Sequence, residues 1–368
     1  MVVSKRTSED QPSWEDGTDG VRVIRYSPPP KSDPLFAVKY PRAIAREVRR
    51  ELRSLDVDPS GNDTVVHGHF PIPMLSLLGK RQPYVYTFHA PLYKEILGER
   101  QGSYRLPPIA QGVAVSIARR VEAAVLRRAE HVTTLSTFIH GEMTAITGSR
   151  TPPWTLIPGG LDTQHFSPGD ANDVDRHRGP VVLAARRLVE RTGVENLVAA
   201  MPEVLRVHPT TQLMITGDGP RRPHIAKFID SHSLNENVHL LGRVSEEELL
   251  HWYRVADLSV TPTFELEGFG LSTAESMACG TPAVVTPVGA NPEVVAALGP
   301  RFVTDSFAPA DIAARLIDVL SDPALLATAR EASRPAIHPA MSWDNVAERF
   351  CELYEATLLR RESKAPRS

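Results

Sequence analysis

Cysteine is scarce in this sequence of 368 residues, which contains only Cys279 and Cys351. Two cysteines cannot form a disulfide framework or a cysteine-based metal cluster, and their scarcity favours a reducing, cytoplasmic setting. Long apolar runs are also missing, because none approaches the roughly 18 residues that span a bilayer. The first thirty residues are polar and rich in proline, without the apolar core of a signal peptide. We therefore expect a cytoplasmic chain without a membrane-spanning helix.

Neither sign of charge is in large excess. The 41 Lys and Arg residues nearly balance the 44 Asp and Glu residues, so no overall field would hold a phosphate backbone, and nucleic acid is not an expected partner. The two halves differ, with 21 basic against 16 acidic residues over 1–160 and 20 against 28 over 161–368. A hydrophobic content of 42% is typical of a globular chain, and the length favours two domains.

Apolar segments alternate with helical patterns along the whole chain. In the first half, strands are expected over 21–25, 64–67, 84–89, 131–135 and 155–157, and helices over 38–55, 113–129 and 137–147. In the second half, strands are expected over 181–185, 212–216, 238–241, 258–261, 283–286 and 302–304. This alternation predicts an α/β fold with parallel, doubly wound sheets, whose ligands lie outside the carboxyl ends of the strands. An apolar stripe over 341–359 predicts a terminal amphipathic helix, with Trp343 and its neighbours packed in a core.

The segment 263–292 carries the strongest chemical signal. Gly268 and Gly270 let the backbone pass close to a ligand, and the amides of Phe269, Gly270 and Leu271 form a phosphate cradle at a helix start. Glu267 lies just before that helix and Glu275 lies inside it, roughly 8 Å further along an axis that rises about 1.5 Å per residue. Two carboxylates at this separation can each bind a diol. A sugar joined to a nucleoside through a diphosphate presents two such diols, with phosphates between them.

Glu267-x7-Glu275, within EGFGLSTAESMACGTPAVVTPVG, resembles the donor-site signature of retaining glycosyltransferases of family 4, which have the GT-B fold. The resemblance extends through 157–162, 181–201, 214–220 and 238–263, and more weakly through 65–71 and 86–91. It implies two Rossmann-like domains that face each other across a cleft. These are an acceptor-binding domain over 1–160 and a nucleotide-sugar-binding domain over 161–340, with the helix over 341–368 packed back toward the first.

The resemblance also implies roles for single residues at the reacting end of the donor. Glu267 would bind the hydroxyls of the donor sugar, and the amides of Phe269 and Gly270 would face the sugar and the diphosphate. Arg187 would neutralise the departing diphosphate, and His89 would lie over the sugar near the scissile bond. Fixed positive groups in a closed cleft can stabilise the leaving phosphate, so we expect neither a metal ion nor a cofactor beyond the nucleotide sugar itself.

At the nucleoside end, the resemblance implies that Glu275 binds the ribose diol and that Arg243 and Val244 meet the base. Gly217 would line the same pocket. The expected donor is a UDP-sugar that gives up a hexosyl-type group. The expected acceptor is a hydroxyl of a lipid carrier, a saccharide or a small molecule, and basic helices over 38–55 and 113–129 are compatible with a peripheral membrane contact.

Two departures from the family bear on activity. Family members commonly carry Arg-x4-Lys at the diphosphate, but Thr192 stands in the lysine position and Arg191 precedes it. A guanidinium binds phosphate well, so we expect Arg191 to take this role and Thr192 only to line the site. The family also begins with a strand, a Gly-rich loop and a helix that we do not find before 2–5, which suggests an upstream start or a fragment.

Three other interpretations stay open. His67 and His69 could form a metal pair, but no third ligand lies nearby, and a place facing the acceptor is favoured. A sugar-nucleotide epimerase or a phosphorylase would share the architecture; the complete Glu-x7-Glu segment disfavours the former. A non-catalytic or truncated protein that binds a nucleotide sugar or a partner is compatible with Thr192 and with the departure at the N-terminus.

Overall fold

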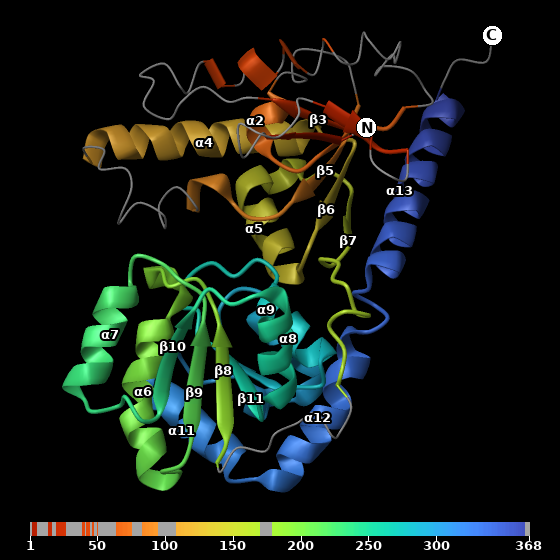
Figure 1. The fold of residues 1–368 in the computed structure, drawn as a ribbon. Coiled ribbons are helices and arrows are strands. Elements are labelled where there is room, and N and C mark those ends of the chain that lie inside the picture. Colours follow the sequence, from red (N-terminus) through yellow and green to blue (C-terminus); the bar gives the residue numbers. More distant parts are fainter. Residues whose placement is uncertain are drawn as a thin grey trace.

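The computed structural model describes residues 2–5, 14–16, 20–26, 39–40, 42–44, 46–47, 50, 64–75, 83–94, 108–169 and 179–364. Two α/β domains lie one above the other in Figure 1, joined by the linker after residue 156 and by the long C-terminal helix. This arrangement agrees with the doubly wound α/β domains predicted from the alternation of apolar segments.

The first domain is built on a parallel sheet in chain order, formed by β4 (His67–Gly68), β5 (Val85–Phe88), β6 (His131–Thr134) and β7 (Trp154–Leu156). Its helices are α2 (Pro71–Met74), α4 (Pro108–Arg128) and α5 (Thr137–Thr147). Every residue of β5 and β6 is buried, as is usual for parallel strands covered on both faces. Phe88 and Leu126 belong to the core between this sheet and its helices.

A second, three-stranded sheet contains β1 (Val2–Lys5), β2 (Trp14–Asp16) and β3 (Arg22–Tyr26). β3 lies in the middle, parallel to β1 and antiparallel to β2. The strand expected over 21–25 is thus confirmed with a shift of one residue. The described residues between 39 and 50 are helical, and the rest of the helix expected over 38–55 lies outside the described residues.

The second domain contains a parallel sheet in the order β10-β9-β8-β11-β12. Its strands are β8 (Val181–Ala185), β9 (Gln212–Thr216), β10 (Val238–Gly242), β11 (Leu258–Thr261) and β12 (Ala283–Val285). Its helices are α6 (Val194–Val207), α7 (Arg222–Ser231), α8 (Glu246–Val255), α9 (Leu271–Ala278), α10 (Asn291–Val294), α11 (Pro309–Leu320) and α12 (Pro323–Ile337). The order places β8 and β11 at the point where the winding reverses, which is where ligands bind in such sheets.

The prediction of a strand over 302–304 is wrong. Residues 300–302 form a short 3-10 helix after Gly299, and only Val303 makes a bridge, to Val285. The apolar pattern arose because Phe302 is fully buried in this turn rather than in a ladder. Proline at residue 300 fixes the first φ of the turn and cannot donate a ladder hydrogen bond.

The C-terminal helix α13 (Trp343–Lys364) joins the two domains (Figure 1). Its start pairs with the linker, because Leu161 bridges Ser342 and donates its amide to the Met341 carbonyl at 2.9 Å. Further along, Val346 and Leu353 share a buried cluster with Val85 of the first domain.

Polar contacts reinforce the docking of α13 on the first domain. Arg361 donates to Glu130 at 2.8 Å and to the Thr64 carbonyl at 2.7 Å.

Trp343 was expected in a core, but it is exposed, with its ring lying against linker Gly160, where a side chain would collide with it.

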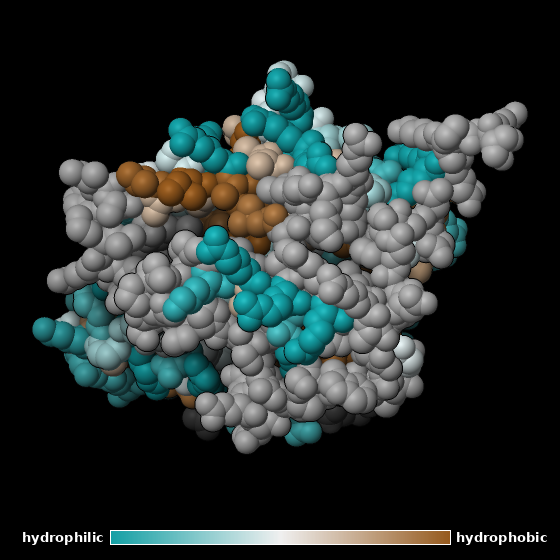
Figure 2. Space-filling view, turned by 90° about the horizontal axis from the view of Figure 1, so that it is seen from above, coloured by the Kyte–Doolittle hydropathy of each residue, from teal (hydrophilic) through white to brown (hydrophobic). Residues whose placement is uncertain are grey.

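Helix α4 exposes apolar side chains on the first domain. Figure 2 shows an apolar band over this helix, where Val113 and Ile117 are 55% and 54% exposed. Arg119 and Arg120 follow them and are exposed too. Within the described part of the chain, every helix is too short or too polar to span a membrane.

We predict that Leu353→Ala destabilises the fold, because Leu353 is only 8% exposed between α13 and the first domain. Removing a buried leucine side chain typically costs about 2–5 kcal/mol, and the edge of a small cluster favours the lower end. The matched control is Leu359→Ala on the same helix, since Leu359 is 64% exposed and its loss should change the free energy of unfolding by less than about 0.5 kcal/mol. Urea unfolding measures both, and equal effects would contradict the described docking of α13.

Candidate functional site

The candidate site lies at the carboxyl end of β11, where a loop leads into α9. Gly270 is the N-cap of α9 with a φ of +86°, and it has no side chain to cap the first amides of the helix. The first N–H groups of a helix need acceptors from outside it, and the helix dipole favours an anion there. The start of α9 is thus without a side-chain cap, and phosphate binding by this loop stays a prediction.

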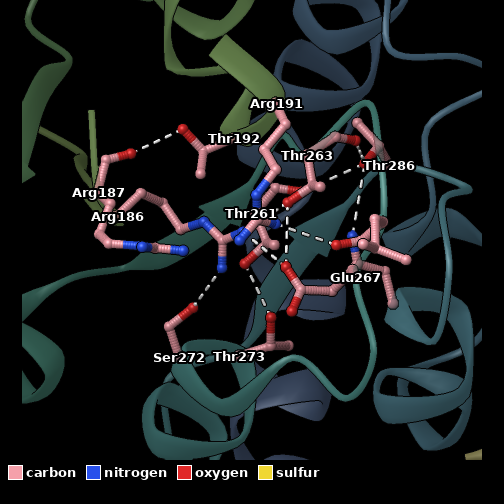
Figure 3. A network of polar contacts seen from close by, with 12 residues as sticks. Arg186, Arg187, Arg191, Thr192, Thr261, Thr263, Glu267, Ser272, Thr273 and Thr286 are labelled. Atoms are coloured by element: carbon pink, nitrogen blue, oxygen red, sulfur yellow. Dashed lines mark hydrogen bonds and ion pairs between the residues drawn. The ribbon is translucent and has the colours of Figure 1, made fainter. Parts of the chain in front are cut away.

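An ion pair holds Glu267 in this loop. Arg186 donates through Nη2 to Glu267 Oε2 at 2.6 Å and to Thr263 Oγ1 at 2.6 Å, and through Nη1 to Ser272 Oγ at 3.1 Å (Figure 3). Thr263 also donates to Glu267 Oε2, at 3.2 Å. Arg186 thereby links the end of β8, the loop over residues 262–270 and the first turn of α9. This loop is called the donor loop below, because it carries the donor-site signature found in the sequence. The sequence pattern does not single out Arg186, because Arg187 beside it matches the family signature.

Glu275 lies inside α9, where the Tyr253 hydroxyl donates to its Oε2 at 2.8 Å. Burial raises the pKa of the Glu275 carboxyl above its usual range, and the Tyr253 hydrogen bond opposes that rise. Burial and the neighbouring Glu275 also raise the pKa of Tyr253, which stays a phenol and a donor. Tyr253 therefore hydrogen-bonds one of the two oxygens of the Glu275 carboxyl group.

His89 follows β5 and approaches the donor loop from the first domain. A Cβ placed on Gly268 would lie only 2.8 Å from the His89 carbonyl oxygen, so glycine is required for this close approach. His89 Nε2 lies 3.1 Å from His69 Nδ1. Desolvation, followed by the nearby His69, lowers the pKa of His89 to about 4, so its imidazole is neutral at pH 7.

The three residues proposed around the diphosphate differ in their surroundings. The Arg187 side chain is exposed and makes no hydrogen bond or ion pair with any residue that the structure describes. Arg191 donates to the Leu266 carbonyl at 3.1 Å and so contacts the same loop. Thr192 is buried and donates to the Arg187 and Val189 carbonyls within its own turn.

The residues expected near the base lie at neighbouring strand ends. Gly217 follows β9 and donates its amide to the Gly242 carbonyl at the end of β10, at 2.6 Å. A side chain on Gly217 would collide with the Arg186 carbonyl. Arg243 and Val244 come directly after β10. All of these positions share the carboxyl edge of the sheet with Glu267.

Two contacts across the domains were missed by the sequence analysis. Ser136, the N-cap of α5, donates to the Gly268 carbonyl at 2.8 Å. The Glu293 carboxylate of the second domain accepts from the first two amides of α5, those of Thr137 and Phe138, at 2.8 Å each. The helix start at Ser136 is visible in the sequence, but nothing local indicates that a carboxylate 155 residues away completes its cap.

The surroundings of His67, His69 and Cys279 support neither a metal pair nor a cysteine nucleophile. His67 and His69 do not act as a pair, because His67 Nδ1 lies 2.6 Å from the Tyr354 hydroxyl and its Nε2 lies 2.7 Å from Thr87 Oγ1. In the described ranges, no cluster of three or more His, Cys, Asp or Glu residues could hold a metal ion. Burial raises the pKa of the Cys279 thiol to about 12, which leaves it a poor nucleophile.

Comparison with known proteins matches each domain to a family. Residues 1–165 match the family described as Glycosyltransferase Family 4, and residues 171–335 match the one described as Glycosyl transferases group 1. The chain is 28% identical to a glycogen synthase of Mycobacterium tuberculosis over 97% of its own length and 85% of that protein. It is 27% identical to a GDP-mannose-dependent monoacylated alpha-(1-6)-phosphatidylinositol monomannoside mannosyltransferase of Corynebacterium glutamicum, over 56% of its own length and 57% of that relative.

A solved structure of sucrose-phosphate synthase from Thermosynechococcus elongatus has a similar fold. It superposes with a TM-score of 0.79 at 22% identity and covers 97% of this chain and 88% of its own. This likeness confirms the predicted architecture of two Rossmann-like domains across a cleft.

We predict that Glu293→Ala loosens the contact between the domains. The variant leaves the amides of Thr137 and Phe138 without their acceptor, and the loss of a helix cap costs about 1 kcal/mol. The radius of gyration of the ligand-free protein, measured by small-angle X-ray scattering, should therefore increase. Glu331→Ala, which removes an exposed carboxylate of α12, is the control and should leave the scattering unchanged. An unchanged radius in Glu293→Ala would show that the cap does not hold the domains together.

The raised pKa of Glu275 predicts a pH-dependent stability. The folded chain binds the proton of this carboxyl more tightly than the unfolded chain, so the contribution of Glu275 to stability falls as the pH rises from about 4.5 through the higher folded pKa. Glu275→Gln keeps an acceptor for Tyr253 and removes this loss. Its free energy of unfolding relative to the wild type should therefore rise between about pH 4 and 7, by about 1.4 kcal/mol per pKa unit. Urea unfolding across that range measures the difference, with Glu355→Gln on α13 as the exposed control. A flat difference would contradict the desolvation of Glu275.

Proposed function

We propose that this chain, a glycosyltransferase with the GT-B fold, moves a hexosyl-type sugar from a nucleoside-diphosphate donor to an acceptor hydroxyl, with retention and without a metal ion. The observation that carries the proposal is the close approach of His89 to Gly268, between the two domains. The contact is made by the His89 carbonyl oxygen, and it brings His89, whose imidazole is neutral at pH 7, to the loop that holds Glu267. We propose that the anomeric carbon of a bound sugar lies between these two residues.

The leaving diphosphate is stabilised by fixed positive groups. The uncapped amides at the start of α9 face it, and Arg187 projects from the end of β8 with no other partner among the described residues. Donors that are held in place before the reaction stabilise developing negative charge without reorganising, which is usually a large part of enzymatic rate enhancement. This arrangement supplies the charge that a metal ion would otherwise provide.

Glu267 and His89 hold the sugar. Arg186 occupies Oε2 of Glu267, so Oε1 can accept from sugar hydroxyls. A carboxylate engaged in this way is a poor covalent nucleophile, and no other described residue is proposed for that role. Retention then arises by attack of the acceptor hydroxyl on the face that the diphosphate leaves, with a phosphate oxygen taking the proton.

The nucleoside end is formed by Glu275, which binds the ribose diol, and by the backbone at Arg243 and Val244, which meets the base. Gly217 lines the pocket beside them. We propose a UDP-sugar as the donor, with a GDP-sugar as the alternative, because GDP-mannose is named for the Corynebacterium relative. Both donors present the same diphosphate and ribose to the site.

The acceptor lies on the first domain, near the ends of β4 and β5. For a lipid-linked acceptor, we propose that α4 contacts the membrane surface. Val113 and Ile117 supply exposed apolar groups, and Arg119 and Arg120 supply positive charge, the combination that interfacial helices use.

We predict that the purified full chain releases a nucleoside diphosphate from one member of a panel of UDP-, GDP-, ADP- and TDP-sugars, and that EDTA does not stop the release. His89→Ala and Glu267→Ala should lower kcat by about a hundredfold or more, since each removes a group placed at the reacting carbon. His251→Ala, which removes an exposed imidazole of α8, is the control and should retain activity. Proton NMR of the product should show the anomeric configuration of the donor.

Three results would contradict the proposal. Binding of a sugar nucleotide without turnover would identify a non-catalytic protein. Interconversion of the donor sugar without an acceptor would identify an epimerase. An inverted product would leave a transferase but exclude attack on the leaving-group face.

A further inference from the structure

We propose that Arg186 donates its remaining Nη1 hydrogen to the donor diphosphate, while its Nη2 hydrogens hold Glu267 and Thr263. This inference rests on the proposed function, since it concerns the same donor site. It gives the site a second cation at a position that the motif comparison did not indicate.

The hydrogen bonds of Arg186 leave part of its guanidinium unused. A guanidinium carries five N–H groups. Nη2 donates to Glu267 and Thr263, and Nη1 donates to Ser272. The remaining Nη1 hydrogen has no acceptor among the described residues, and Nε is buried without one. The side chain is only 10% exposed, and an Nη1 hydrogen without a partner in such surroundings costs free energy that a diphosphate oxygen can recover.

The Nη1 group of Arg186 lies where an anion is expected. Ser272 is the second residue of α9, so the Nη1 contact at 3.1 Å places the guanidinium beside the uncapped start of that helix. Figure 3 shows Arg186 between Glu267 and Ser272. The amides of a helix start and an arginine N–H beside them can donate to the same phosphate group.

The backbone holds Arg186 in this orientation. Its amide donates to the Thr216 carbonyl at 3.0 Å, and its own carbonyl packs against Gly217, where a side chain would collide. Arg186 therefore leaves the central strand β8 at a fixed place, with its side chain directed toward α9. The side chain of the next residue, Arg187, is exposed to solvent.

The same geometry bears on which residue supplies a second positive charge at the diphosphate, a question that the sequence left open. Thr192 is buried and donates to the carbonyls of Arg187 and Val189, and Arg191 uses one Nη1 hydrogen on the Leu266 carbonyl. Arg186 is the arginine that contacts both Glu267 and the first turn of α9. Arg186 and Arg187 then form the cationic pair at the diphosphate.

The test separates binding of the diphosphate from neutralisation of Glu267. Isothermal titration calorimetry on the full chain measures UDP and GDP against uridine and guanosine, for Arg186→Gln, Glu267→Gln and the double variant. The double variant removes both charges, so it avoids leaving Glu267 buried without a partner. We expect Arg186→Gln to bind the diphosphate about ten to a hundred times more weakly than the wild type, as for loss of a charged hydrogen bond. We expect the double variant to bind it more weakly than Glu267→Gln by the same factor. Affinity for the nucleoside should stay within about twofold.

Arg186→Lys keeps the charge without the guanidinium and should lose about tenfold or less. Arg301→Gln, which removes an arginine paired with Asp318 and Asp322, is the control and should bind like the wild type. Equal diphosphate affinities of Glu267→Gln and the double variant would overturn the proposal and leave Arg186 a partner of Glu267 only. If Arg186→Gln does not fold, the double variant and Arg186→Lys still decide. Failure of the wild type to bind either diphosphate would instead overturn the proposed function.

Discussion

The donor loop depends on one ion pair, which neutralises the partly buried Glu267 carboxylate at the carboxyl end of the C-terminal sheet. A buried charge without a partner is strongly destabilising, so Glu267 needs both Arg186 and Thr263 beside it. The hydrogen bonds of Arg186 to Thr263 and Ser272 hold the end of β8, the loop after β11 and the first turn of α9 close together. Arg186 thus lies beside the uncapped start of α9, because it also donates to Ser272 in the first turn of that helix.

The donor loop is also shared between the domains. Ser136 caps α5 and at the same time donates to the Gly268 carbonyl, while Glu293 completes the cap from the opposite side of the cleft. The start of α5 thus takes two of its polar partners from the second domain. The conformation of the donor loop and the approach of the first domain are parts of one hydrogen-bonded unit, which is how His89 comes to face Gly268.

Local patterns predicted the strands of the second half well, and 181–185, 212–216 and 258–261 agree residue for residue with β8, β9 and β11. Buried parallel strands are short apolar runs, so they stand out in sequence. The same signal failed at 302–304, because a buried Phe302 in a turn gives the same run. The Glu-x7-Glu spacing indicated where both carboxylates lie. It could not indicate their partners Arg186 and Tyr253, because tertiary contacts between distant segments decide which side chains meet them.

The two crossings between the domains, the linker and the start of α13, are paired rather than independent. Leu161 donates to the Met341 carbonyl, Trp343 donates back to Leu161, and the indole of Trp343 covers Gly160. The chain therefore crosses between the domains twice at one place, and each crossing is held by hydrogen bonds to the other. A rotation of one domain against the other at this place would strain both hydrogen bonds at once.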